Sequence, residues 1–140
     1  MPRIMAIDYG TKRVGIAVTD PLQLIATALT TVSPFELMAY LENYFKNDAV
    51  EILVVGEPKK IDGSQTNASQ PTNDFVAHFK KKFPNIKVER EDERYTSKMA
   101  MDAIIMSGSK KKDRQKKENI DKVSAVIILQ SYLSRVKWQS

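Results

Sequence analysis

The chain has 140 residues, of which 42% are hydrophobic and 28% are charged, as in ordinary globular proteins. We therefore expect one domain spanning residues 1–140, without a membrane span or a signal-peptide pattern. The absence of cysteine excludes disulfides and thiolate metal sites and fits a reducing cytoplasm. The formal charge of +5 favours anionic partners, nucleic acid above all.

The first 20 residues predict a β-hairpin. An apolar run over residues 4–7 leads into Asp8, residues 9–12 form a turn around Gly10, and residues 14–18 return as a second strand. A carboxylate at the end of a buried strand is costly unless a cation meets it, which makes Asp8 a candidate metal ligand or catalytic group. The alternative is an Asp that forms the turn by bonding its own backbone.

The next elements alternate between strand and helix. Residues 26–32 are β-rich and predict a third strand. Ser33 as N-cap, Pro34 at the first helical position and Glu36 in a capping box predict a helix to about residue 45. Residues 51–56 form the clearest buried strand, with Val50 as a candidate first residue. The polar loop that follows, residues 57–70, lies where open α/β sheets place their sites.

The second half continues this alternation. A helix is expected from about residues 69–71, with phenylalanines spaced four apart on its core face: Phe75, Phe79 and Phe83. His78, the only histidine, is expected to be structural or exposed. Residues 86–94 predict a strand and residues 96–106 a helix, and residues 107–119 contain no apolar side chain. A final helix over residues 120–136 is expected to follow an Asn119 cap, with anchors at Ile120, Val123, Ile127 and Ile128.

The order of these elements predicts an α/β fold. Three antiparallel strands followed by strands that alternate with helices indicate a mixed five-stranded sheet covered on both faces. The order βββαβαβα is that of the ribonuclease H-like architecture.

Acidic residues fall where predicted elements begin or end. Asp8 closes the first strand, Asp92 and Glu93 close the last one, and Asp121 lies in the first turn of the final helix. Three carboxylates that converge at one end of a sheet form an oxygen-ligand site for Mg²⁺ or Mn²⁺, and two such ions about 4 Å apart can cleave a phosphodiester. Taken singly, Asp121 could complement a helix dipole, and Asp92 and Glu93 could be a solvated strand end.

A basic run precedes Asp121 and consists of Lys110, Lys111, Lys112, Arg114, Lys116 and Lys117. A charge run is usually a solvated loop. Beside a metal site, however, the same run would contact the phosphates of a nucleic acid and position it. Four further cations could extend this positive rim: Lys12, Arg13, Lys59 and Lys60.

Four segments in this order resemble the YqgF family, also described as Holliday-junction-resolvase-like proteins: IDYGTKRVGIAVTDP, VVGEPKKIDGS, EDERYTS and IDKVSAVIILQSYL. The resemblance implies a ribonuclease H-like fold and a nuclease that processes the 5′ end of pre-16S ribosomal RNA in the bacterial cytoplasm. It also implies site carboxylates at Asp8, at Glu93 with Asp92 as its rival, and at Asp121. Arg94, Thr96 and Ser97 match motif positions whose expected role is structural or phosphate-contacting.

One departure from the family pattern concerns Glu57, which stands where the family usually has an apolar residue. Glu57 could be an extra acidic ligand, or it could pair with Lys59 or Arg94. The identity of the second carboxylate therefore stays open between three residues: Asp92, Glu93 and Glu57.

These patterns favour a metal-dependent endonuclease acting on structured RNA, as a monomer or homodimer. The alternatives are a dimeric junction-resolving DNase and a nuclease-fold protein that only binds RNA or ribosomes. Asp8, Gly10 and Thr11 also resemble the phosphate loop of actin-like and sugar-kinase ATPases, but those proteins need two such domains, for which 140 residues leave no room.

Overall fold

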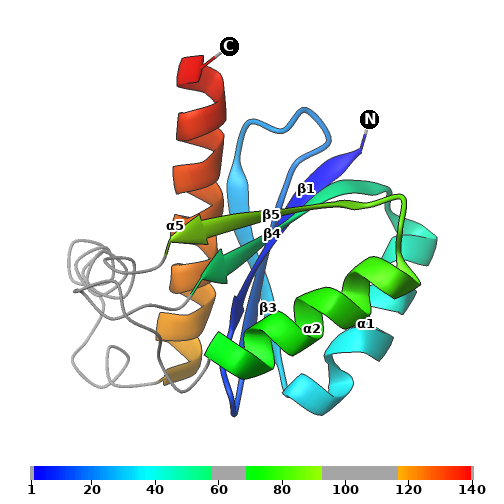
Figure 1. Ribbon diagram of the computed structural model, residues 1–140. Helices are drawn as coiled ribbons and strands as arrows, with labels where there is room; N and C mark the ends of the chain where they lie inside the picture. Colours follow the sequence, from blue (N-terminus) through cyan, green and yellow to red (C-terminus); the bar gives the residue numbers. More distant parts are fainter. Residues whose placement is uncertain (1, 58–68, 93–116, 140) are drawn as a thin grey trace.

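The computed structural model describes residues 2–57, 69–92 and 117–139 of the chain (Figure 1). In chain order, its strands and helices are β1 (Arg3–Tyr9), β2 (Val14–Thr19), β3 (Ala26–Val32), α1 (Pro34–Asn47), β4 (Val50–Glu57), α2 (Ser69–Lys82), β5 (Lys87–Asp92) and α5 (Lys117–Gln139). The helix predicted over residues 96–106 and the basic run over residues 110–116 lie outside the described residues.

Local sequence signals account for most element boundaries. The backbone N–H of Glu36 donates to Ser33 Oγ over 3.3 Å, so Ser33 caps α1 and Pro34 takes its first position, as predicted. The prediction for α5 was wrong at its start, because the helix already includes Lys117 and therefore contains Asn119 rather than being capped by it. Lys and Glu favour helices without adding apolar periodicity, which hides this first turn from a pattern search.

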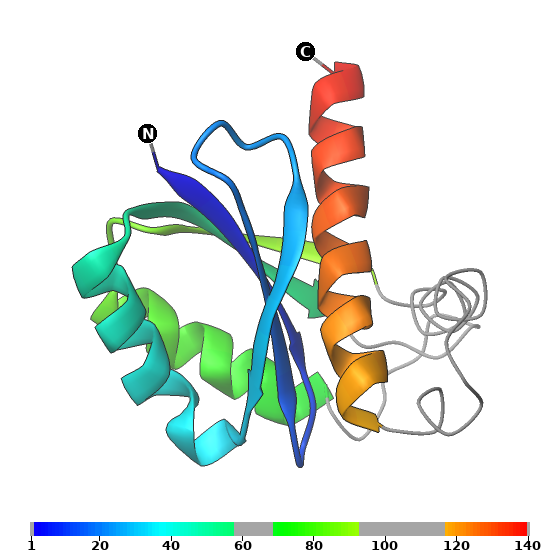
Figure 2. The ribbon, with the colours of Figure 1, turned by 180° about the vertical axis from the view of Figure 1, so that it is seen from behind.

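The five strands form one mixed sheet in the order β3-β2-β1-β4-β5 (Figures 1 and 2). β1 pairs in parallel with β4, and β4 in parallel with β5, whereas β2 is antiparallel to both β1 and β3. This arrangement confirms the predicted α/β sheet. It directs the carboxyl ends of β1, β4 and β5 to the same edge of the sheet.

Side chains alternate along the strands between two separate cores. Met5, Ile7, Leu53 and Val55 pack beneath α1 and α2, together with the predicted phenylalanine face of α2. Ile4, Ala6 and Val54 pack instead against α5. Helices therefore cover both faces of the sheet, as the sequence predicted.

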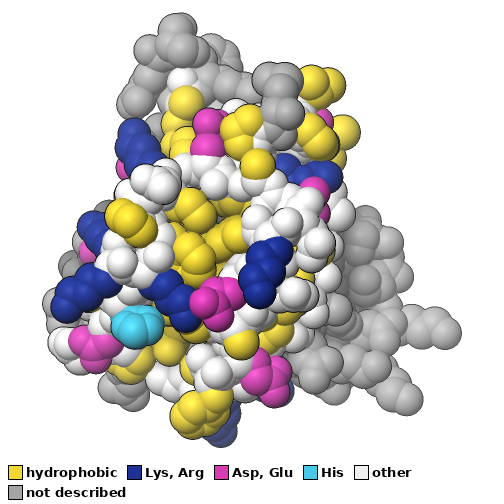
Figure 3. Space-filling view, turned by 90° about the vertical axis from the view of Figure 1, so that its right-hand side faces the viewer, with side chains coloured by type: hydrophobic (Ala, Val, Ile, Leu, Met, Phe, Trp, Pro, Cys, Tyr) yellow, Lys and Arg dark blue, Asp and Glu magenta, His cyan; other side chains and the backbone are white. Residues whose placement is uncertain are grey.

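One aromatic contact and one ion pair join α1 to the C-terminal end of α2 on the first face. Phe83, predicted to lie on this helix, is the residue directly after its last residue, Lys82. Phe45 makes an edge-to-face contact with Phe83, with ring centroids 5.0 Å apart, and Lys82 pairs with Glu42 over 2.8 Å. Figure 3 shows a hollow with a hydrophobic floor on this side of the molecule, rimmed by charged side chains and by His78, which is exposed. His78 is therefore exposed, which was one of the two environments predicted for it.

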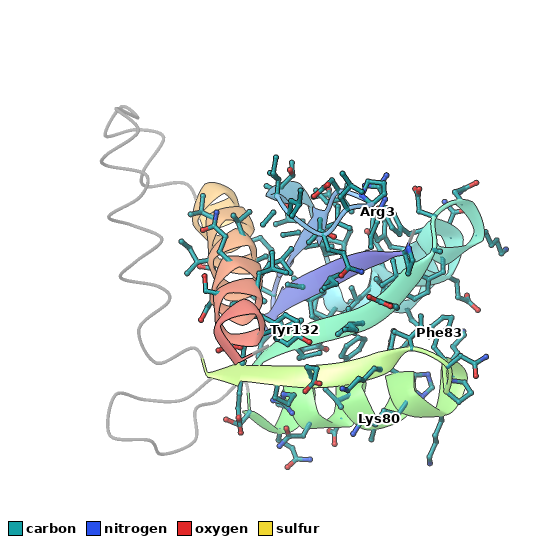
Figure 4. The ribbon with its side chains drawn as sticks, turned by 90° about the horizontal axis from the view of Figure 1, so that it is seen from above. Arg3, Lys80, Phe83 and Tyr132 are labelled. Atoms are coloured by element: carbon teal, nitrogen blue, oxygen red, sulfur yellow. The ribbon has the colours of Figure 1, made fainter. Side chains whose placement is uncertain are left out.

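The buried face of α5 differs from the predicted anchors. Among the side chains of α5 that the structure describes, which do not include Ile120, the buried apolar residues are Ala125, Ile128, Leu129, Tyr132 and Leu133. Tyr132 lies between α5 and the sheet (Figure 4). Ile128 is an anchor as expected, but Val123 and Ile127 are only half-buried. Because residues 123–134 contain no charge, apolar side chains occur on several helix faces and their spacing does not identify the buried one.

Candidate functional site

The ends of three parallel strands define the candidate site. The register places Ile7 beside Val55 and Val55 beside Arg90, so that the next residues along, Asp8, Gly56 and Glu91, follow one another across the sheet. One position further, Glu57 pairs with Asp92, the last residue of β5. Acidic residues from all three strands therefore occur within two residue positions of one sheet edge.

Asp8 belongs to the α5 side of this edge. It is paired with Gly15 in a regular part of the β1–β2 ladder, so the alternation of Ile4 and Ala6 toward α5 continues to Asp8. The Asp8 side chain is half-buried. The carboxylate therefore lies on the α5 side of the sheet and is only partly exposed to water.

Glu91 faces the same side as Asp8 and was missed by the sequence analysis. Its Oε1 accepts a hydrogen bond from Ser131 Oγ of α5 over 3.3 Å. The sequence shows Glu91 only as one member of a charged run, but strand alternation could have found it. Val88 packs toward α1 and α2, so residues an odd number of positions away must face α5.

The tight turn between β1 and β2 fixes the end of the strand that carries Asp8. Gly10 N–H donates to the carbonyl oxygen of Arg13 over 2.9 Å, and a Cβ added at Gly10 would lie 2.5 Å from that oxygen. The turn thus requires glycine at this position. Lys12 is exposed on the turn and Arg13 is partly exposed, which leaves both cations next to the strand end.

A different polar group occupies the α2 side of the same edge. Arg90 Nη1 donates to Asn73 Oδ1 of α2 over 3.2 Å, while its buried Nε has no hydrogen-bond partner among the described residues. Tyr9 stacks on Phe75 with ring centroids 5.4 Å apart. Burial raises the pKa of the Tyr9 hydroxyl, and the nearby Asp74 charge raises it further, so this phenol stays protonated at neutral pH.

Glu57 also belongs to the α2 side, because it continues the alternation of Leu53 and Val55 in β4. It therefore projects from the opposite face of the sheet to Asp8. This placement favours the pairing role for Glu57 over a ligand shared with Asp8.

For two of the other predicted site residues, Asp92 and Asp121, the structure describes the position of the backbone only. Asp92 is located by its backbone as the last residue of β5, and Asp121 as the fifth residue of α5. The N-terminal end of α5 lies at the same end of the molecule as the carboxyl end of β1 (Figures 1 and 2). Glu93, Arg94 and the basic run from Lys110 to Lys116 fall outside the described residues.

The donor chemistry of this edge suits a hard divalent cation. Its described acidic side chains, Asp8, Glu57 and Glu91, offer oxygen ligands, which Mg²⁺ and Mn²⁺ prefer. Among the side chains that the structure describes, which do not include those of Asp92, Glu93 and Asp121, no three acidic, histidine or cysteine residues are grouped closely enough to hold a metal ion by themselves.

None of the helices in the described parts of the chain is both long and apolar enough to span a membrane.

Comparison with known proteins gives consistent matches over nearly the whole chain. A family model for RuvX, described as Holliday junction resolvase, matches residues 2–135. A Christiangramia forsetii protein named "Putative pre-16S rRNA nuclease" is 52% identical over 133 residues, which cover 95% of this chain and 98% of that protein. A Flavobacterium psychrophilum protein of the same name is 50% identical over 135 residues, covering 96% and 98% of the two chains.

A solved structure supports the fold independently. The structure described as "T. thermophilus RuvC in complex with Holliday junction substrate" matches with a TM-score of 0.54 over 97% of this chain and 96% of its own. The sequence identity is 15%, so this likeness concerns the fold alone.

Proposed function

The chain belongs to the RuvX family, and we propose that it is a metal-dependent endonuclease that cleaves structured RNA, with processing of the 5′ end of pre-16S ribosomal RNA as its role. The observation that carries this proposal is the half-buried Asp8 at the common end of β1, β4 and β5. It occurs in a chain about half identical to proteins named as nucleases of this RNA. As a nuclease, the protein is a hydrolase of phosphodiester bonds.

Three carboxylates are proposed to hold Mg²⁺ or Mn²⁺: Asp8, Glu93 and Asp121, with Asp92 as the rival of Glu93. When bound, such an ion supplies an activated water and stabilises the leaving oxygen of the phosphodiester. The chain itself holds Asp8 in place through the β1–β2 ladder and the Gly10 turn. Asp8 is half-buried on the face of the sheet that packs against α5, so its carboxylate is only partly exposed to water.

The cations near this edge are proposed to bind the nucleic-acid backbone. Lys12 and Arg13 lie on the β1–β2 turn directly after Asp8. The other proposed phosphate contacts are Arg94, Lys110, Lys111, Lys112, Arg114, Lys116 and Lys117. Contacts to phosphate position a strand without reading its sequence, so a structured RNA would be recognised by its shape and its cleavable position. Action on a ribosomal precursor would place the protein in the cytoplasm, with ribosomal particles as partners.

A second candidate function follows from the family description, which names Holliday junctions as the substrate. A junction resolvase would cut two symmetric DNA strands and would need two sites in a dimer. A third possibility is binding to RNA or ribosomes without cleavage.

Substrate preference separates these functions. Purified protein is incubated with Mg²⁺ and either a precursor spanning the 5′ end of 16S rRNA, a four-way DNA junction, or an unstructured RNA of equal length. The proposal predicts cleavage of the precursor at a defined position and little cleavage of the other two substrates. Preferential symmetric cutting of the DNA junction would instead indicate a junction resolvase. Tight RNA binding without any cutting would indicate a protein that only binds RNA.

A further inference from the structure

A polar surface lies at the acidic edge of the sheet, on the face opposite to Asp8. Tyr9 directly follows Asp8 in β1 and projects toward α2, where its ring stacks on Phe75 with ring centroids 5.4 Å apart. Two exposed residues of α2, Asn73 and Asp74, come just before Phe75 in the chain. The Asp74 carboxylate is close enough to Tyr9 to raise the pKa of its hydroxyl. An aromatic ring, an amide and a carboxylate thus lie next to the residue that carries the proposed site.

The amide of Asn73 has a fixed orientation. Arg90 Nη1 of β5 donates to Asn73 Oδ1 over 3.2 Å, and Arg90 Nε is buried, which holds the base of the guanidinium in the interior. Because a guanidinium has only donors, it selects the oxygen end of the amide. The Nδ2 end of Asn73, which carries two N–H donors, is therefore left to face a ligand.

The carboxylate of Asp74 is held in a similar way. Gln70 Nε2, one turn earlier in α2, donates to Asp74 Oδ1 over 2.7 Å. Each carboxylate oxygen has two lone pairs, so Oδ1 and Oδ2 together can accept two further N–H donors. Asn73 and Asp74 therefore present donors and acceptors in succession, and each is restrained by a neighbour before any ligand binds. Such preorganisation lowers the entropy cost of binding.

The charges on this side of the edge do not suit a phosphate. Asp74 and Glu57 are both on the α2 side and would repel an anion, whereas the guanidinium of Arg90 already donates to Asn73. A nucleobase is uncharged, and it offers N–H and C=O groups at its edge together with an aromatic face. The ring of Tyr9 is partly exposed and can stack on such a face. The chemistry of this surface therefore favours a base over a phosphate.

Among the four bases of RNA, guanine matches this arrangement. Its pairing edge has two adjacent donors, N1–H and N2–H, which one carboxylate can accept as a pair, and beside them the O6 acceptor, which suits an amide N–H. Adenine, cytosine and uracil each lack part of this pattern. We propose that Asn73 and Asp74 form a guanine-binding subsite, in which Asp74 accepts from N1–H and N2–H, Asn73 Nδ2 donates to O6 and Tyr9 stacks on the ring.

The position of this subsite gives it a role in the proposed function, on which the inference rests. Asp8 and Tyr9 are consecutive residues whose side chains leave opposite faces of β1. A strand of RNA with a phosphate at Asp8 would therefore pass around the edge of the sheet. Consecutive Cα atoms are about 3.8 Å apart, which is within the reach of one nucleotide. The subsite thus selects guanine in a nucleotide beside the cleaved bond.

Binding of short RNAs without Mg²⁺ tests the subsite, because the proposed cleavage needs the metal ion. The probes are three single-stranded RNAs of equal length, in which uridines flank a central guanosine, adenosine or inosine. Inosine keeps the O6 and N1–H of guanine but lacks the N2 amino group. The wild type is expected to bind the guanosine RNA at least about 10-fold more tightly than the adenosine RNA, with the inosine RNA between them.

Two substitutions that each remove one negative charge separate base reading from general electrostatics. Asp74→Asn replaces the acceptor with an amide of nearly the same shape, so the preference for guanosine over adenosine is expected to fall to within about 2-fold. Glu36→Gln removes an exposed carboxylate from α1 and should keep the wild-type preference. Asn73→Ala should weaken binding of the guanosine and inosine RNAs alike, because both present O6.

Three outcomes are informative about the subsite. Equal affinity of the wild type for the guanosine and adenosine RNAs would overturn the inference, and so would an Asp74→Asn variant that keeps the preference. A protein that binds none of the three RNAs would contradict both the subsite and the action on RNA. A preference for guanosine in a protein that does not cleave the precursor RNA would support the subsite and refute only the nuclease function.

Discussion

Ser131 of α5 donates a hydrogen bond to the carboxylate of Glu91 in β5, joining the last helix to the end of the outer parallel strand. This bond crosses from the helix that carries Asp121 to the strand that leads into Glu93. It therefore links the two described elements from which the remaining site carboxylates are expected to come. The neighbouring contacts between α5 and the sheet include many apolar side chains, so a polar bond also helps to fix the position of α5 along the sheet.

Replacing Ser131 with alanine is expected to lower the free energy of unfolding by about 1 kcal/mol, because one hydrogen bond to a carboxylate is lost. Ser134→Ala provides the control, since Ser134 is exposed on the same helix and its loss should change stability by less than about 0.5 kcal/mol. Urea unfolding of both variants measures the difference. If the two substitutions have the same effect, the Ser131–Glu91 bond does not stabilise the junction between α5 and β5.

Gly10→Ala is expected to destabilise the protein by about 1–3 kcal/mol. The new methyl group would lie 2.5 Å from the backbone oxygen of Arg13, so the turn after Asp8 would have to open. Thr11→Ala changes an exposed neighbour in the same turn and should be almost neutral. Thermal unfolding compares the two variants, and an unchanged melting temperature for Gly10→Ala would show that the turn can accept a side chain.

Asp20 gives the protein a pH-dependent contribution to stability. The N–H of Ile25, and then those of Leu24 and Leu22, hold the pKa of Asp20 below its usual value of about 3.9. A lowered folded-state pKa stabilises the fold above the unfolded value, and this contribution disappears as the pH falls through the folded value. Asp20→Asn should therefore lower the melting temperature at pH 7 more than at a pH well below 3.9.

The measurement is a pair of thermal melts for the wild type and Asp20→Asn at each pH. A melting-temperature difference of equal size at both pH values would mean that the charge on Asp20 does not hold the loop before β3.

Sequence patterns predicted the fold well because the strands are short, apolar and separated by clear turn signals. The boundaries of β3 and the cap of α1 follow directly from β-branched residues and from the Ser33-Pro34 signal. The start of α5 could not be predicted, since Lys117 and Glu118 carry no apolar periodicity. The buried face of α5 was also ambiguous, because Val123 and Ile127 are as apolar as the residues that the sheet covers.

The candidate site was harder to predict than the fold. Asp8 stood out as an acid after a buried strand, and the structure gives that residue a definite side of the sheet. Glu91 did not stand out, because it is one of several charged residues in a row, between Glu89, Arg90 and Asp92. Alternation from Val88 places Glu91 on the opposite face of β5 to Val88, but which face lies against α5 is set by pairing between strands far apart in the sequence.

The most direct test of the account is the cleavage rate of the precursor RNA by Asp8→Asn, with Mg²⁺ present and the wild type and Thr11→Ala prepared in parallel. Asparagine has nearly the same shape as aspartate but lacks the charge, so the fold and RNA affinity should be retained while cleavage falls by at least roughly 100-fold. Thr11→Ala should cleave at close to the wild-type rate. Equal rates for Asp8→Asn and the wild type would contradict the assignment of this sheet edge as the active site.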